Sequence, residues 1–308
     1  MTTSGDNEEP SNGNHPQGPV LVTGAAGMLG SQVLLTLPDG DRAVGTDLVD
    51  RAGVDVAGVD LADEAAVAAL WAEHGPFSGV IHTAAYTAVD MAEEQEDLAR
   101  RVNGDACGVL AAACAEAGIP LVLVSTDFVF DGSATEPYKE DAPPSPLSAY
   151  GRTKLLGELL AQKAHPKGTR IVRTQWLYGP RGKNFPSTML ALAAERDLLR
   201  VVDDQRGSPT STLELAPALW DVLHKGEAGI YHAVCDGEAS WFDLAAATLE
   251  LAGVEGVTVE PCSTDEFPRP AHRPPYSALS CERLTALRGA PLAPWRDALT
   301  TYLGTEAS

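Results

Sequence analysis

Two side chains four residues apart, Tyr150 and Lys154, have the types and spacing that could carry out proton transfer. On a helix, residues at this spacing share a face, so we expect the Lys154 ammonium near the Tyr150 hydroxyl, where it would lower the pKa of the tyrosine. A tyrosine tuned in this way can exchange a proton with a carbonyl or alcohol oxygen while a hydride moves to or from the adjacent carbon. The pair stands at the predicted start of a helix that follows a predicted strand ending at Ser125.

Ser125, Thr126 and Asp127 stand together where that strand ends. A hydroxyl at this place can hydrogen-bond the same oxygen as Tyr150, which makes Thr126 a candidate catalytic residue. The alternative is that Thr126 only caps the turn.

A glycine-rich turn follows the first predicted strand and precedes an apolar helix. Its glycines are Gly24, Gly27 and Gly30, in the spacing Gly-x-x-Gly-x-x-Gly. Such a turn lets backbone N–H groups approach a pyrophosphate at a helix N-terminus, where the helix dipole favours an anion. The position between strand and helix favours dinucleotide binding over the alternative, a plain tight turn.

Acidic residues follow the next two predicted strands. Asp47 could accept hydrogen bonds from an adenosine ribose and repel a 2′-phosphate, which favours NAD(H), although Arg42 and Arg51 could pair with that phosphate instead. The alternative for Asp47 is a cap. Asp60 and Leu61 follow a short third strand, where an adenine pocket is expected.

The elements that must position these residues alternate along the chain from Pro19 to about residue 180. The predicted strands are Val20–Thr23, Ala43–Thr46, Gly79–His82, Leu121–Ser125 and Arg170–Arg173; the predicted helices are Leu29–Leu37, Glu64–Glu73, Asp97–Ala117 and Ala149–Ala164. This alternation predicts an α/β fold of the Rossmann type, a doubly wound parallel sheet with helices on both faces.

Three regions are expected. Residues 1–18 are polar and rich in Pro, Gly and Asn, which predicts a disordered tail. Residues 19–180 form the dinucleotide-binding domain. Residues 181–308 are rich in proline and predict a smaller, irregular substrate-binding region over the carboxyl edge of the sheet; interleaving of the two regions stays open.

Composition excludes several classes of protein. The chain has 308 residues with 22 Lys+Arg and 43 Asp+Glu, a net charge of −21. Without a basic cluster, neither nucleic acid nor an anionic membrane is an expected partner. Apolar runs are too short to span a bilayer, and the five cysteines form no metal or disulfide pattern. These features predict a cytoplasmic globular protein.

Six segments together resemble an extended short-chain dehydrogenase, and more narrowly the dTDP-4-dehydrorhamnose reductase family. They occur in family order and span about residues 19–303: Ala84–Asp90, Ser125–Gly132, Tyr150–Lys154, Arg173–Gly179, Asp204–Thr210 and Arg273–Leu279. The segments Asp204-Gln-Arg-Gly-Ser-Pro-Thr210 and Arg273-Pro-Pro-Tyr-Ser277 distinguish this family from other extended dehydrogenases.

The resemblance implies reduction of the C4 keto group of a dTDP-linked 6-deoxyhexulose by NADPH or NADH. Tyr150 would donate the proton, Lys154 would hold the nicotinamide ribose, and Thr126 would hold the keto oxygen. The implied substrate-binding residues are Thr126, Asp127, Trp176 and Arg273, the last of them facing the diphosphate; Trp176 as a core residue and Arg273 paired with a carboxylate are the alternatives. The implied cofactor-binding residues are Gly24, Gly27, Met28, Leu29, Gly30, Asp47, Asp60, Leu61, Ala85, Tyr86, Thr87, Tyr150 and Lys154.

Some family members dimerise through a magnesium ion held by glutamates. Here one of those positions is Gln32, and Leu299–Gly304 holds no glutamate, although Glu195 is present. We therefore expect no metal, and a monomer or weak homodimer. Three other functions stay open: reduction of a modified sugar such as the dTDP-dihydrostreptose precursor, an epimerase or dehydratase that keeps its cofactor, and a non-catalytic nucleotide-binding regulatory subunit.

Overall fold

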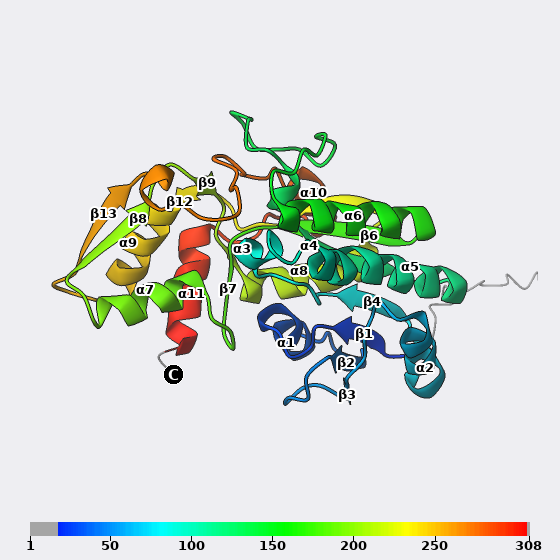
Figure 1. Cartoon of the computed structure of the whole chain (residues 1–308). Coiled ribbons are helices and arrows are strands. Elements are labelled where there is room, and N and C mark those ends of the chain that lie inside the picture. Colours follow the sequence, from blue (N-terminus) through cyan, green and yellow to red (C-terminus); the bar gives the residue numbers. More distant parts are fainter. Residues whose placement is uncertain (1–17, 307–308) are drawn as a thin grey trace, which may run out of the picture.

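A seven-stranded sheet forms the centre of the computed structural model, which describes residues 18–306 (Figure 1). The strand order is β11-β6-β5-β4-β1-β2-β3, and every neighbouring pair is parallel. The strands are β1 (Val20–Thr23), β2 (Ala43–Asp47), β3 (Val56–Ala57), β4 (Gly79–His82), β5 (Leu121–Thr126), β6 (Thr169–Thr174) and β11 (Gly229–His232). This confirms the predicted Rossmann-type fold; the predicted tail, apart from Gly18, lies outside the described residues.

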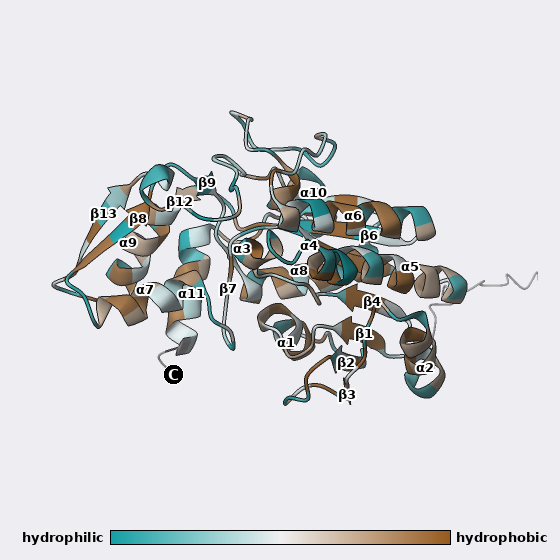
Figure 2. Ribbon diagram, in the orientation of Figure 1, coloured by the Kyte–Doolittle hydropathy of each residue, from teal (hydrophilic) through white to brown (hydrophobic). Residues whose placement is uncertain are grey.

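Helices cover both faces of this sheet because its strands are apolar on both sides. Val20 and Val22 of β1 pack in a cluster with α1 (Met28–Leu35), α8 (Thr212–Lys225) and α10 (Glu282–Arg288). Leu21, between them, faces the opposite cluster with α2 (Glu64–His74), α5 (Ala106–Ala117) and α6 (Ala149–Ala164). Alternating side chains therefore fill both layers, as a buried parallel sheet requires. In Figure 2 the strands β1 and β4 are accordingly hydrophobic.

The helix predicted over Asp97–Ala117 consists of three parts. It begins as α4 (Glu96–Arg100), widens into a π-helical turn over Arg101–Asp105, and continues as α5. The side chain of Asn103, in this wide turn, forms two hydrogen bonds with the backbone of Tyr86. It accepts from the Tyr86 N–H at 2.8 Å and donates to the Tyr86 C=O at 3.1 Å. Periodicity predicts helix here but cannot distinguish a π turn, which is common near functional sites.

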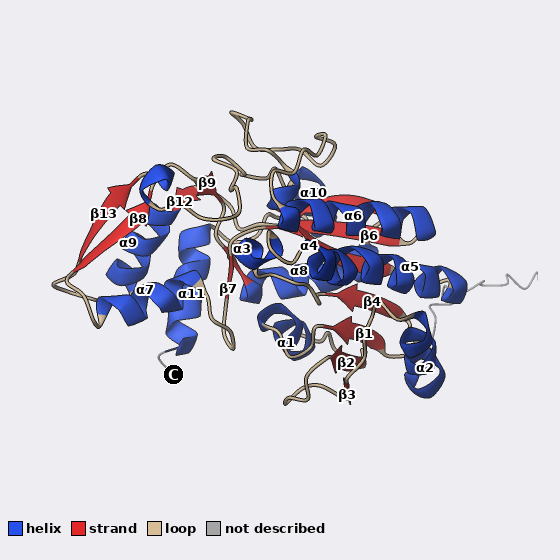
Figure 3. Ribbon diagram, in the orientation of Figure 1, coloured by secondary structure: helices blue, strands red, loops and turns tan. Residues whose placement is uncertain are grey.

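A second unit lies beside the carboxyl ends of the strands, at the left of Figure 3. It consists of α7 (Phe185–Ala193), α9 (Trp241–Leu251) and α11 (Trp295–Glu306), with β8 (Leu198–Val202) pairing in parallel with β13 (Thr258–Cys262). It has its own apolar clusters. Between its parts the chain returns to the main sheet through α8 and β11, so the region after residue 180 interleaves with the one before it.

The remaining elements are short. They are α3 (Val89–Ala92), η2 (Asp127–Val129), η3 (Thr264–Glu266) and the two-residue pairs of β7 (Leu177–Tyr178) with β10 (Thr210–Ser211) and of β9 (Arg206–Gly207) with β12 (Ala239–Ser240). Among the described residues no helix has the length and apolar character needed to cross a membrane.

Candidate active site

The glycine turn connects β1 to α1. Two of its glycines lie so close to neighbouring backbone that a side chain would not fit there. Gly24 has a φ of +70°, and a Cβ there would lie 2.6 Å from the Ala84 nitrogen. A Cβ on Gly30 would lie 2.1 Å from the Gly24 oxygen. Gly27 is the N-cap of α1 and provides no side-chain acceptor, so the first N–H groups of the helix are left for another acceptor. This cradle suits the pyrophosphate of a dinucleotide.

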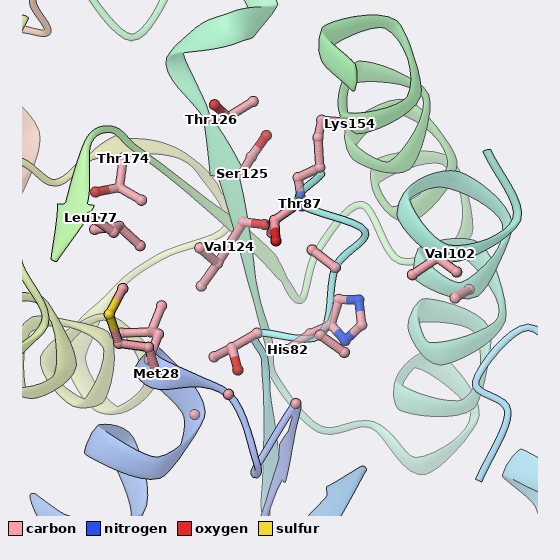
Figure 4. Close-up of a pocket in the computed structure, with 18 of the residues that line it drawn as sticks. Met28, His82, Thr87, Val102, Val124, Ser125, Thr126, Lys154, Thr174 and Leu177 are labelled. Carbon is pink, nitrogen blue, oxygen red and sulfur yellow. The ribbon is translucent and has the colours of Figure 1, made fainter. Parts of the chain in front are cut away.

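The turn opens into a cavity of about 660 Å³ at the carboxyl edge of the sheet (Figure 4). The structure brings most of the sequence-predicted residues to its wall: Gly24, Gly27, Met28, Leu29, Gly30, Asp47, Asp60, Leu61, Ala85, Thr87, Thr126, Asp127, Tyr150, Lys154 and Trp176. Two others lie elsewhere. Tyr86 donates its hydroxyl to Gln95 at 3.0 Å, and Arg273 lines a second cavity.

The two acidic residues of the adenosine side already have backbone partners. Asp47 accepts from the N–H of Ala26 at 3.0 Å and so ties β2 to the glycine turn. Asp60 accepts from the Ala62 N–H at 3.0 Å and from Arg101 at 2.6 Å, and these bonds lower its pKa. Both carboxylates are therefore held in place before a ligand binds.

Tyr150 lies in the first turn of α6, against the end of β5. Ser148 caps this helix by accepting from the Gly151 N–H at 3.2 Å. A Cβ on Gly151 would lie 2.2 Å from the Phe128 oxygen, so the glycine lets α6 approach the β5 end closely. Burial raises the pKa of Tyr150 to about 12; interaction with Thr126 lowers it, and the charge of Asp127 raises it further.

The spacing predicted that Lys154 lowers the pKa of Tyr150, and this prediction was wrong. Its ammonium is 4% exposed and donates to the Val124 oxygen at 2.7 Å, so the backbone of β5 takes the charge. Burial lowers the pKa of Lys154 itself. Helical spacing predicts that the two side chains share a face, but not which acceptor the long lysine side chain reaches.

Thr126 and Asp127 are buried at the inner end of the cavity. The Thr126 hydroxyl donates to Asp127 Oδ1 at 3.0 Å and accepts from the Phe128 N–H at 3.2 Å, so it also caps the turn. Asp127 Oδ2 has no hydrogen-bond partner among the described residues. Burial raises the pKa of Asp127 to about 6.

Buried charges behind the cavity were not predicted. Glu158, one turn after Lys154 on α6, accepts from Arg173 Nη2 at 2.6 Å and Nε at 2.9 Å, and from the Ser125 hydroxyl at 2.5 Å. Both charged side chains are 2% exposed. This pair ties α6, β5 and β6 together directly behind the catalytic candidates.

A second cavity, of about 880 Å³, lies in the C-terminal unit. Its wall carries Arg196, Arg200, Arg269 and Arg273 against one carboxylate, Asp265, in a chain whose net charge is −21. Apolar side chains line the rest, among them Phe185, Met189, Leu192, Leu198, Trp241 and Phe267. This combination suits a ligand with an anionic group and a flat apolar part.

Stacked indoles stand between the two cavities. Trp176 lines the first and Trp241 the second, with ring centroids 3.8 Å apart and an interplanar angle of 13°. Trp176 has a φ of +48°, a conformation that L residues rarely adopt. Trp176 is therefore a half-buried residue of the cavity wall that stacks on Trp241, and not part of the fully buried core.

Other lining residues were missed by sequence reasoning. Lys183, in the loop before α7, lines the first cavity beside the contact of Gly182 with Met28. His82 ends β4 with its Nδ1 2.6 Å from the Thr23 hydroxyl, and burial lowers its pKa to about 3. Among the described residues no group of three or more His, Cys, Asp or Glu could hold a metal ion.

Fold and cavities together define a dinucleotide-dependent enzyme of the extended short-chain dehydrogenase class. The model of the RmlD substrate binding domain family matches residues 18–307. The dTDP-4-dehydrorhamnose reductase of Streptomyces griseus is 42% identical over 296 residues, which cover 93% of each chain. The dTDP-4-keto-6-deoxy-D-glucose reductase of Streptomyces niveus is 39% identical and covers 91% of this chain and 94% of its own.

A solved structure agrees. The dTDP-4-dehydrorhamnose reductase of Bacillus anthracis, crystallised with NADP, is 34% identical with a TM-score of 0.86, covering 94% of this chain and 99% of its own. The chain therefore belongs to the dTDP-4-dehydrorhamnose reductase family, a family of oxidoreductases.

Proposed function

We propose that this protein reduces the C4 keto group of a dTDP-linked 4-keto-6-deoxyhexulose, with dTDP-4-dehydro-L-rhamnose as the first substrate to test. The observation that carries the proposal is the placing of Tyr150 and Thr126 in the same cavity as the glycine turn, one indole stack away from the arginine-rich cavity. Sugar and nucleotide of one substrate would then occupy the two cavities.

In this reaction the reduced nicotinamide supplies a hydride to the sugar C4. The residues of the chain bind and protonate the keto oxygen. If it turns its one hydrogen away from Asp127, the Thr126 hydroxyl can donate to the keto oxygen and hold it beside Tyr150. Because burial raises the pKa of Tyr150 to about 12, its hydroxyl is protonated at neutral pH and can give its proton to that oxygen as the alcohol forms.

Proton donation leaves Tyr150 as a phenolate, in a cavity whose wall also carries the cationic side chains of Lys154 and Lys183. The proton is then replaced from water. No metal takes part in this proposal.

Both nicotinamide cofactors are to be tested. Asp47 stands at the end of β2, and no arginine lines the first cavity, which favours NADH. The Bacillus anthracis relative holds NADP. Among the described residues, the cationic side chains that line this cavity are Lys154 and Lys183, and either could pair with a 2′-phosphate, so NADPH is tested beside NADH.

The test follows the absorbance of NADPH, and separately of NADH, with dTDP-4-keto-6-deoxy-L-hexulose generated enzymatically in the same tube. Oxidation with formation of dTDP-L-rhamnose is expected. Absence of oxidation by a protein that binds the cofactor would contradict the proposal. Net consumption of reduced cofactor also distinguishes a reductase from an epimerase or dehydratase.

A second candidate differs only in the sugar. The Streptomyces niveus relative is named for a D-configured 4-keto sugar, and it matches this chain almost as well as the Streptomyces griseus reductase. The same assay with dTDP-4-keto-6-deoxy-D-glucose tests that candidate.

A further inference from the structure

An ion pair links Asp90, on α3, to Arg273, in the wall of the second cavity. Arg273 donates from Nη1 to Asp90 Oδ1 and from Nη2 to Asp90 Oδ2, each at 3.0 Å. Asp90 lies on α3, next to Val89 of the first cavity, whereas Arg273 lines the second. The pair therefore stands at the junction of the two cavities.

The geometry leaves one side of the guanidinium available. Arginine has five N–H donors, which form two edges able to bind a carboxylate or phosphate in bidentate fashion. Asp90 takes the Nη1–Nη2 edge, and the second Nη1 hydrogen goes to the Ala271 oxygen at 2.9 Å. Nε has no hydrogen-bond partner among the described residues, so the Nε–Nη2 edge remains for an anion.

Asp90 also shapes the loop that carries the arginine. Its Oδ1 accepts from the Ala271 N–H at 3.2 Å, and Arg269 lies 4.0 Å from its Oδ2. Burial raises the pKa of Asp90, but the bonds from Arg273 and Ala271 outweigh this and hold the pKa below its usual value. The carboxylate is thus charged, and it fixes both the loop and the arginine.

We infer that Asp90 is a positioning residue for substrate binding: it occupies one edge of the Arg273 guanidinium and turns the other edge toward the diphosphate in the second cavity. This rests on the proposed function, because it takes the ligand to be a dTDP-sugar. Arg273 could then pair with the Asp90 carboxylate through one edge and bind a phosphate through the other at the same time.

The test measures the Kd of dTDP, by calorimetry, and of NADPH, by its fluorescence, on the full-length protein. Asp90→Asn keeps the size of the side chain and removes its charge; we expect about a tenfold weaker Kd for dTDP and an unchanged Kd for NADPH. Asp90→Glu keeps the charge but shifts the carboxylate by one methylene, and it should also weaken dTDP binding. In an Arg273→Ala background, Asp90→Asn should add no further loss.

A matched control is the pair of Asp221 and Arg288, which also lies at 3.0 Å with side chains 25% and 22% exposed, against 30% and 23% for Asp90 and Arg273. Asp221→Asn should leave the Kd of dTDP unchanged. Equal or tighter dTDP binding by Asp90→Asn would overturn the positioning role alone. Failure of the unsubstituted protein to bind dTDP would overturn the proposed function as well.

Discussion

Trp176, in a left-handed backbone conformation, stacks on Trp241, whose indole lies nearly parallel to it with the ring centroids 3.8 Å apart. The supporting residue is itself fixed, because Trp241 Nε1 donates to Gln205 at 3.1 Å. A Cβ on Gly207 would lie 2.9 Å from Trp176 Cε2, so this glycine lets the backbone approach the ring closely. The wall between the two cavities therefore depends on Trp241, which lines the second cavity and not the first.

Trp241→Ala should accordingly raise the KM for the dTDP-sugar about fivefold with little change in kcat, because stacking of this kind contributes about 1 kcal/mol beyond buried area. Steady-state kinetics checks this. Trp71→Phe, in α2 and away from both cavities, is the control. A fall in kcat at constant KM would contradict the assigned role.

Tyr150→Phe removes the proposed proton donor and keeps the ring that packs edge-on against Phe128 at 5.5 Å. A positioned general acid typically contributes 10²- to 10⁴-fold, so kcat should fall by about 10³. The Kd for NADPH, measured by fluorescence, should stay the same. Near-normal turnover would rule out Tyr150 as the donor.

Asp127→Asn should stabilise the protein at high pH. The pKa of Asp127 rises from 3.8 to about 6 on folding, so the folded protein holds this proton more tightly than the unfolded chain. Ionisation in the folded state then costs about 3 kcal/mol above roughly pH 7, less between about pH 4 and 6, and nothing below about pH 4. The variant avoids this cost.

Urea unfolding of both proteins at several pH values measures the difference. The gain in free energy of unfolding should be largest near pH 8 and should vanish toward pH 4. A difference that stays constant with pH would show that Asp127 does not titrate in this way.

Lys183→Ala should weaken cofactor binding. In the described part of the chain, Lys154 and Lys183 are the only cationic residues that line the first cavity, and Lys154 is bound to a backbone oxygen. Loss of the Lys183 charge should raise the Kd for NADPH about fivefold at low salt and less at high salt, because salt screens the attraction.

Two variants make that measurement specific. Lys183→Arg keeps the charge and should bind NADPH almost normally. Arg181→Asn removes an exposed charge from the same loop at a φ of +66°, which asparagine tolerates, and should change nothing. Equal weakening by Arg181→Asn would mean that only the net charge matters.

Glu158→Gln should destabilise the protein strongly. It leaves the guanidinium of Arg173, 2% exposed, without its carboxylate, and breaking a buried pair in this way costs about 3–5 kcal/mol. Glu96→Gln breaks the exposed pair with Arg152 and should cost less than about 1 kcal/mol. Chemical denaturation compares the two; equal losses would contradict the buried role.

The sequence was most informative where the signal is local. The strand around Val20, the glycine turn and the helix that carries Tyr150 each follow from a few neighbouring residues, and all three are present. Contacts between distant segments could not be predicted. Glu158 and Arg173 give no sign in the sequence that they meet, and the pairing of Arg273 was left between a phosphate and a carboxylate. The predicted lowering of the Tyr150 pKa by Lys154 was wrong, because the spacing does not show that the ammonium bonds to the Val124 oxygen or that burial raises the pKa of Tyr150.

The return of the chain to the main sheet through α8 and β11 makes the enzyme indivisible. A fragment ending at residue 180 would keep Tyr150 and the glycine turn, but β6 would become an open edge and the α1 face would lose Leu215, Leu219 and Trp220. Neither half is a transferable module. Because the two halves share these contacts, we expect a nucleotide bound in one cavity to raise the free energy of unfolding of the whole chain.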